Sequence, residues 1–192
     1  NWDGKKIANS SFPKMIKNSS LGIIGMGRIG KILANYALSF DMNVFYYSPN
    51  TKVNNSRFIR CKSIYSVAEK SDFISINASL NNKTKKMIDI KFFKKMKKNS
   101  YFISTSRGEI VDENHLIFAL KNKYLKGAAI DILSGEEQLI SNPKLIKKNK
   151  VFIYAKKYNN LFLFPHIAGS AKDVINYFNE KTIEIVINKF KS

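Results

Sequence analysis

The stretch that decides the fold runs from Leu21 to Gly30 and reads LGIIGMGRIG. Its first half is apolar and predicts a short buried strand, and its second half is a G-x-G-x-x-G turn. After the turn, apolar residues recur at helical spacing, at Ile32, Leu33, Tyr36, Ala37 and Phe40. A strand, a glycine turn and a helix in this succession are typical of a dinucleotide-binding site.

Each glycine of the turn has a physical reason in such a site. Gly25 permits the tight turn, Gly27 lets a pyrophosphate approach the backbone, and Gly30 allows helix and strand to pack closely. The helix that follows offers free N–H groups and the positive end of its dipole to phosphate. The alternative is a merely structural glycine turn. We expect the whole turn to contact a cofactor, namely Gly25, Met26, Gly27, Arg28, Ile29 and Gly30.

Length and composition bound the protein class. The chain has 192 residues, of which 44% are hydrophobic, and no apolar run is long enough to span a bilayer. It starts without an initiator Met and without an apolar signal region, so we expect a cytoplasmic protein. The single Cys61 excludes an intramolecular disulfide and a cysteine-based metal site, and we expect it to be a small buried residue. No metal site is predicted.

The net charge of +19 raises the question of nucleic-acid binding. A nucleic-acid binder gathers its basic residues on one face, with aromatic residues for stacking. Here the lysines occur in groups that are spread along the chain, at residues 94–98, 147–150 and 156–157. Since Asn and Ile are also abundant, we interpret the lysines as a compositional bias. They are expected on a solvated surface that attracts an anionic cofactor and substrate, with no nucleic acid or membrane as partner.

Strands and helices alternate along the chain, which predicts an α/β fold with a doubly wound parallel sheet of the Rossmann type. Strands are expected at residues 21–24, 43–47, 58–60, 73–77, 101–104 and 128–132, and helices at 63–70, 88–98 and 112–123. Residues 134–150 are polar and predict an irregular loop with at most one helical turn. Residues 151–154 and 161–164 are both strand-like, and only one of them need belong to the main sheet. Ser170 and Asp173 form a capping box before a long helix that reaches about Lys189.

Polar residues follow three of the predicted strands, at the edge where open α/β sheets hold their ligands. Thr105, Ser106 and Arg107 follow one strand, Asp131 and Glu136 another, and the segment from Pro165 to Gly169, which includes His166, the third. Each of these residues has an ordinary structural explanation when it is considered alone. Together, beside a dinucleotide turn, they indicate an acid–base pair with an anion-binding group.

The end of the second strand selects the cofactor in dinucleotide folds. An acid about 20 residues past the glycines binds the adenosine ribose hydroxyls in NAD-dependent proteins. Ser48 occupies that position here, and no acid is nearby. Ser48, with Asn50, Lys52 and Arg57, could instead tolerate a 2′-phosphate. This strand end therefore leaves open the choice between NAD, which is the expected cofactor, and NADP.

Three segments resemble the nucleotide-binding domain of the D-2-hydroxyacid dehydrogenases. They are GIIGMGRIG at 22–30, STSRGEIVDENHLIFALKNKYLKGAAIDI at 104–132 and PHIAGS at 165–170, and the similarity covers nearly the whole chain. The resemblance implies that Arg107 binds the substrate carboxylate and carbonyl and that Glu136 pairs with a catalytic His166. It also implies that Asp131 holds the nicotinamide carboxamide. Cofactor contacts are further expected at Ser48, Thr105, Ser106, His166 and Gly169.

The resemblance implies an enzyme that interconverts a 2-oxo acid and a D-2-hydroxy acid by hydride transfer to or from a nicotinamide. It implies a homodimer through this domain and a separate substrate domain, with residues 1–20 leading in from it. Residues 21–170 then form the dinucleotide-binding domain, and the helix at 171–192 returns toward the substrate domain. The alternative is a dinucleotide-sensing interaction module that resembles the C-terminal-binding corepressors.

The sequence departs from the family pattern at several positions. Glu137 follows Glu136 where the family usually has Pro. Asn77 and Ser79 stand where a His-x-Pro pair often lies, and the connection from Glu136 to His166 is longer than usual.

Overall fold

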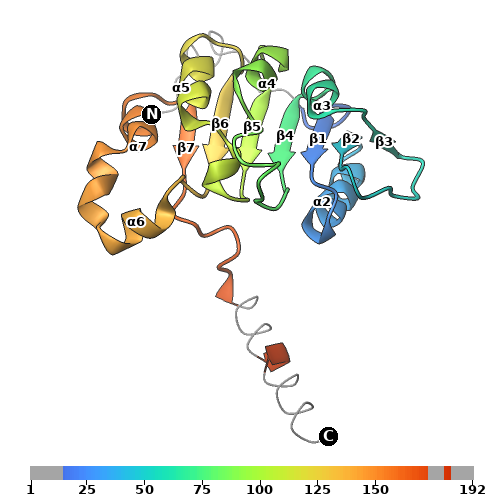
Figure 1. The fold of residues 1–192 in the computed structure, drawn as a ribbon. Helices are drawn as coiled ribbons and strands as arrows, with labels where there is room; N and C mark the ends of the chain where they lie inside the picture. The colour runs from blue at the N-terminus through green and yellow to red at the C-terminus, as the bar shows by residue number, and fades with distance from the viewer. Residues whose placement is uncertain (1–14, 173–179, 183–192) are drawn as a thin grey trace, which may run out of the picture.

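The computed structural model describes residues 15–172 and 180–182. In this part of the chain, seven strands form one parallel sheet in the order β3-β2-β1-β4-β5-β6-β7 (Figure 1). The strands are β1 (Ser20–Ile24), β2 (Asn43–Tyr47), β3 (Phe58–Arg60), β4 (Phe73–Ile76), β5 (Tyr101–Ser104), β6 (Gly127–Ile130) and β7 (Leu161–Leu163). The strand order reverses between β1 and β4, which is where open α/β sheets bind ligands.

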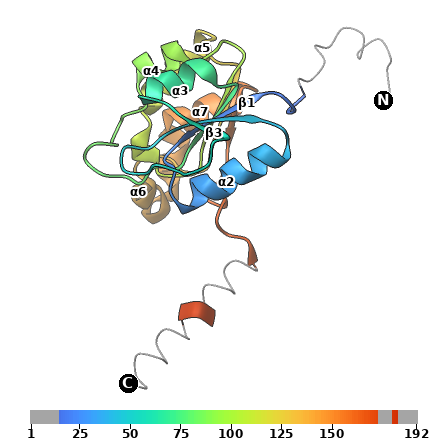
Figure 2. The ribbon, with the colours of Figure 1, turned by 90° about the vertical axis from the view of Figure 1, so that its right-hand side faces the viewer.

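Helices cover the two faces of the sheet. On one face, α2 (Arg28–Ser39) packs against β1 and β2. On the other face lie α3 (Ile64–Lys70), α4 (Ile90–Lys95), α5 (Glu113–Lys121) and α7 (Lys150–Lys157) (Figures 1 and 2). Each of these helices packs against the next one in the row. The shorter elements are α6 (Glu136–Ser141) and the 3₁₀ helices η1 (Gly108–Ile110) and η2 (Pro143–Lys148). The predicted α/β class with a doubly wound parallel sheet is confirmed.

The core is divided by the sheet. All five residues of β1 are buried, as expected for a central parallel strand with a covered face on each side. On the side of α3, α4 and α5, the rings of Phe92, Phe93 and Phe102 meet edge to face with centroids 5.3–6.3 Å apart. On the side of α2, fully buried Ile23 and Met26 pack in a second cluster. Aromatic pairs of this kind stabilise a core beyond their buried area.

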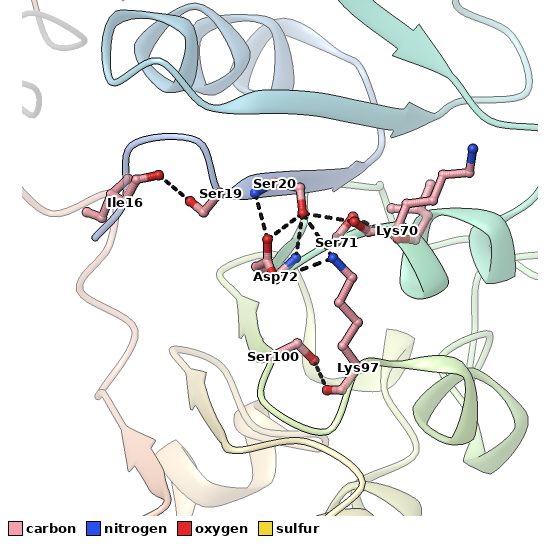
Figure 3. A network of polar contacts seen from close by, with 9 residues as sticks. Ile16, Ser19, Ser20, Lys70, Ser71, Asp72, Lys97 and Ser100 are labelled. Carbon is pink, nitrogen blue, oxygen red and sulfur yellow. Dashed lines mark hydrogen bonds and ion pairs between the residues drawn. The ribbon is translucent and has the colours of Figure 1, made fainter. Parts of the chain in front are cut away.

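A polar network ties together the amino ends of the central strands (Figure 3). The Ser20 N–H donates to Asp72 Oδ2 at 2.9 Å, and the Asp72 N–H donates to Ser20 Oγ at 3.0 Å. Lys97 Nζ lies 3.3 Å from Asp72 Oδ1. Because Ser20 is the first residue of β1 and Asp72 immediately precedes β4, the network fixes the position of one strand against the other. Their opposite ends flank the point where the strand order reverses.

Two predictions between residues 134 and 157 are wrong. The strand-like segment 151–154 lies within helix α7, and only the second strand-like segment joins the sheet, as β7. Asn149 caps α7 by accepting the N–H groups of Val151 (2.8 Å) and Phe152 (3.1 Å), and buried Val151 and Tyr154 lie one helical turn apart. An apolar run of four residues carries too little periodicity to separate strand from helix.

The predicted irregular loop at 134–150 instead contains α6 and η2. The predicted helix at 88–98 is shorter, because Asp89 caps α4 and the helix stops before Met96. Asp173 of the predicted capping box, and most of the predicted C-terminal helix, lie outside the described residues. Among the described residues, no helix is both long and apolar enough to cross a membrane.

Candidate functional site

The glycine turn follows β1 at the carboxyl edge of the sheet. Gly25 has φ +98°, and a Cβ there would lie 2.5 Å from the backbone nitrogen of Ala78, so the position requires glycine. A Cβ on Gly30 would lie 2.3 Å from the Gly25 carbonyl oxygen. A Cβ on Gly27 would meet no heavy atom within 4 Å. Packing within the protein therefore explains Gly25 and Gly30, whereas Gly27 leaves open space beside the start of α2 that suits an approaching phosphate.

The side chains of the turn point in different directions. Met26 is fully buried in the core, so only its backbone is available to a ligand. Arg28 is exposed, and Ile29 is 69% exposed. Ile29 lines a cavity of about 380 Å³ at the ends of β4 and β5, next to the point between β1 and β4 where the strand order reverses. The other polar or site residues that line this cavity are Asn77, Ser79, Thr105, Ser106 and Arg107.

The segment after β5 is held to the segment after β4. The Ser106 hydroxyl donates to the Ala78 carbonyl. Thr105 and Arg107 are both exposed, and Arg107 Nη1 donates to the Ser106 carbonyl at 2.8 Å. Arg107 therefore stands at the mouth of the cavity with most of its guanidinium donors available to an anion.

Ser48 follows β2 and is buried, with 7% of its surface exposed. Arg60 Nη2 donates to the carbonyls of Ser48 (2.9 Å) and Pro49 (3.1 Å). Asn50, Lys52 and Arg57 are the neighbours of Ser48 that the sequence predicts, and Arg60 is not among them. Parallel pairing of β2 with β3, which sets Tyr46 opposite Arg60, brings this arginine beside Ser48. A predicted strand order would have been the only sequence signal for it.

Glu136 and His166 form a hydrogen-bonded pair although 30 residues separate them. His166 Nδ1 lies 2.8 Å from Glu136 Oε1 and 2.9 Å from Oε2. With a carboxylate at Nδ1, that nitrogen carries the proton in the neutral ring, and Nε2 is left for another partner. The histidine side chain is 45% exposed and the glutamate 27%, so the ring is accessible while its partner is shielded.

Asp131 holds the loop that carries His166. Its backbone carbonyl accepts the His166 N–H (2.9 Å), and its carboxylate accepts the N–H groups of Ile167 (2.9 Å) and Ala168 (3.0 Å). Asp131 is only 4% exposed, and His166 has φ +53°. A non-glycine residue in this region costs about 1–3 kcal/mol, which the three hydrogen bonds offset. Asp131 thereby sets the backbone conformation from which the His166 ring projects.

A second cavity, of about 710 Å³, adjoins this pair. Its lining includes Asp131, Glu136, His166 and Gly169. The structure thus brings together three of the predicted site residues, Asp131 after β6, Glu136 at the start of α6 and His166 after β7. Arg107 lines the neighbouring cavity, and the described residues record no direct bond between Arg107 and His166.

A parallel sheet whose strand order reverses beside a glycine turn defines a dinucleotide-binding domain of the Rossmann class. A family model described as "D-isomer specific 2-hydroxyacid dehydrogenase, NAD binding domain" matches residues 1–168. The chain belongs to this family, so the resemblance seen in the sequence is confirmed, and NAD is the cofactor of the family's domain.

Individual relatives agree with this assignment. A Staphylococcus aureus protein named "Putative 2-hydroxyacid dehydrogenase" is 37% identical over 166 residues, which cover 84% of this chain and 49% of that protein. The chain spans about half the length of the curated relatives it matches.

Solved structures share the fold. A D-lactate dehydrogenase from Aquifex aeolicus, complexed with NAD and lactic acid, has a TM-score of 0.81 at 26% identity, over 97% of this chain and 59% of that one. A D-isomer specific 2-hydroxyacid dehydrogenase from Lactobacillus delbrueckii ssp. bulgaricus, in its NAD-complexed form, has a TM-score of 0.83 at 27% identity, over 98% and 57%.

Proposed function

We propose that this chain is the cofactor-binding part of a dehydrogenase that interconverts a 2-oxo acid and a D-2-hydroxy acid. The observation that carries the proposal is the Glu136–His166 pair at the carboxyl edge of a dinucleotide-binding sheet. A nicotinamide, when bound, supplies or accepts the hydride. The open space at Gly27 beside the start of α2 fits the pyrophosphate of such a cofactor.

His166 is the proposed proton donor in reduction of the 2-oxo acid. Its Nδ1–H bonds to Glu136, so Nε2 is the nitrogen that gives a proton to the substrate carbonyl oxygen, or removes it in oxidation. The Glu136 carboxylate stabilises the imidazolium and keeps the ring in one orientation. Arg107 offers a planar fork of N–H donors that matches a carboxylate, so it is the proposed anchor of the substrate.

The cofactor contacts are proposed along the same edge. The glycine turn binds the pyrophosphate, and Thr105 and Ser106 line the adjoining cavity. Each oxygen of Asp131 accepts one backbone N–H, and a carboxylate oxygen has a further lone pair, so this residue remains the proposed partner of the nicotinamide carboxamide. At the ribose end, Ser48 supplies no carboxylate to repel a 2′-phosphate, and the Arg60 guanidinium lies beside it.

We also propose how the chain is divided between domains. Residues 21–170 form the cofactor-binding domain, residues 1–20 lead in from a substrate domain, and residues 171–192 return toward it. Homodimerisation through this domain is supported by a stripe along α2, where Ile32, Tyr36 and Phe40 are 49%, 63% and 62% exposed. An apolar stripe of this kind marks an interaction surface. A cytoplasmic location stays a prediction.

The test is turnover of 2-oxo acids by the full-length protein with NADH. His166→Ala should lower turnover by about 10²–10⁴-fold because the general acid is lost. Glu136→Gln keeps an acceptor for Nδ1–H but removes the charge that stabilises the imidazolium, so turnover should fall by less than in His166→Ala. The exposed Glu137→Gln, next in the chain, is the matched control and should behave like the wild type.

Two results would contradict the proposal. Near-normal turnover by His166→Ala would exclude His166 as the proton donor. Cofactor binding without turnover of any 2-oxo acid by the wild type would favour a dinucleotide-sensing interaction module instead.

A further inference from the structure

The turn that carries Arg107 packs directly on the loop that leads to Glu136. A Cβ added to Gly108 would lie 2.2 Å from the carbonyl carbon of Leu133 and from the nitrogen of Ser134. Only glycine permits this approach. Since β5 and β6 are neighbouring parallel strands, the two segments leave the sheet side by side.

Two glutamates join these segments by accepting hydrogen bonds from backbone N–H groups. The Ser134 N–H donates to Glu113 Oε1 at 2.7 Å, and the Gly135 N–H donates to Glu109 Oε1 at 2.9 Å. Gly135 has φ +71° and is the residue before α6, whose first residue is Glu136. The two carboxylates thus bind the last two N–H groups before Glu136 and define the turn from which its side chain projects.

The segment that supplies these carboxylates is anchored independently of the 133–135 loop. The Lys86 N–H donates to the Glu109 carbonyl (2.7 Å), and the Ile88 N–H donates to the Ile110 carbonyl (3.1 Å). The Asp112 N–H donates in turn to the Ile88 carbonyl (3.0 Å). Glu109 and Glu113 therefore belong to a support that is bonded to the loop between β4 and α4.

Glu113 lies in a partly buried position beside other charged groups. Burial raises the pKa of Glu113, and the neighbouring carboxylates of Glu109 and Asp112 act in the same direction. The Ser134 N–H and the Lys86 ammonium oppose this change. Each of the two glutamates acts on the 134–135 turn through one carboxylate oxygen that accepts a backbone N–H. A glutamine retains such an acceptor.

We propose that Glu109 and Glu113 are positioning residues for the acid–base pair. They hold the 134–135 turn so that Glu136 meets His166, and they couple this pair to the turn that carries Arg107. Their importance for catalysis rests on the proposed function. That the Glu136–His166 hydrogen bond depends on these two carboxylates does not, and it can be tested separately.

The test is the tautomer of His166, measured by long-range ¹H–¹⁵N NMR on the 192-residue chain at a pH where the ring is neutral. The sequence has two histidines, and His115→Gln leaves a single ring to observe. The wild type should show the Nδ1–H tautomer. Glu109→Ala with Glu113→Ala should lose it in favour of Nε2–H, the form expected once Glu136 is displaced.

Matched variants separate positioning from loss of charge. Glu109→Gln with Glu113→Gln should keep the Nδ1–H tautomer, because the glutamine oxygen accepts the same N–H groups. Glu137→Ala, an exposed change in the first turn of α6, should also keep it. If the double alanine variant stays folded and retains the Nδ1–H tautomer, the proposal is overturned.

A second measurement does not depend on whether any variant folds. In the wild type, the amides of Ser134 and Gly135 should exchange with solvent about ten- to a hundredfold more slowly than in an unstructured peptide. Unprotected exchange at both amides would refute the two hydrogen bonds.

Neither measurement involves cofactor or substrate. A protein that turned over no 2-oxo acid could still show the tautomer change, which would leave the positioning role and remove the proposed function. Conversely, if the enzyme were active but its His166 tautomer stayed the same in the double alanine variant, only the positioning role of the two glutamates would be refuted.

Discussion

Replacing Gly27 by valine should abolish tight cofactor binding while leaving the fold intact. Gly27 precedes α2 with φ −77° and ψ −158°, a conformation open to any residue. A Cβ there meets no heavy atom within 4 Å. The added side chain would instead occupy the space that the pyrophosphate needs, so the effect of the substitution should fall on binding.

The magnitude follows from the bonds that the turn offers. A backbone N–H bonded to a charged group is worth about 1.5–3 kcal/mol, and displacing the pyrophosphate from one or two of them should cost about 2–4 kcal/mol. That is about a 30- to 1000-fold rise in Kd. The free energy of unfolding should fall by only about 1 kcal/mol, the typical cost of replacing a favourable N-cap residue.

Gly30→Ala is the matched control, because its Cβ would lie 2.3 Å from the Gly25 carbonyl oxygen. Overpacking of this kind should lower the free energy of unfolding by about 1–3 kcal/mol. The assays are calorimetric titration with NADH and urea denaturation, each on the wild type, Gly27→Val and Gly30→Ala. Equal NADH affinity in the wild type and Gly27→Val would refute the assignment of the pyrophosphate to this turn.

Three further predictions concern other parts of the domain. Asp131→Asn turns an amide N–H toward one of the two N–H groups that the carboxylate accepts, so urea denaturation should show a loss of about 2–3 kcal/mol. The exposed Asp41→Asn, which loses only a surface ion pair, should cost less than about 0.5 kcal/mol, and equal losses would contradict the role of Asp131. With Ser48 in place of an acid, the preference for NADH over NADPH should stay below about a hundredfold, or 2.7 kcal/mol. Arg60→Ala should weaken NADPH binding about tenfold more than NADH binding. If titrations show the same selectivity in this variant as in the wild type, Arg60 is excluded as a phosphate ligand. Tyr36→Glu places a charge in the exposed stripe of α2 and should convert a dimer to a monomer in sedimentation equilibrium, whereas an unchanged mass would place the contact elsewhere.

The sequence by itself determined the class of fold and the family. Apolar runs of four or five residues, separated by helical repeats and turn residues, predict alternating strands and helices because these signals are local. The run LGIIGMGRIG contains its own strand, turn and helix start, so its structure needs little from the rest of the chain. Where the apolar pattern was too short, as in residues 151–154, the Asn149 cap and packing against α5 and β7 selected the helix.

Tertiary structure alone decided which side chains meet. Glu136 and His166 are 30 residues apart in the chain, and parallel pairing of β6 with β7 brings the ends of those strands together. The same rule placed Arg60 beside Ser48 through the pairing of β2 with β3. No local pattern contains these contacts, because the order of strands in a parallel sheet depends on how distant apolar surfaces are buried together.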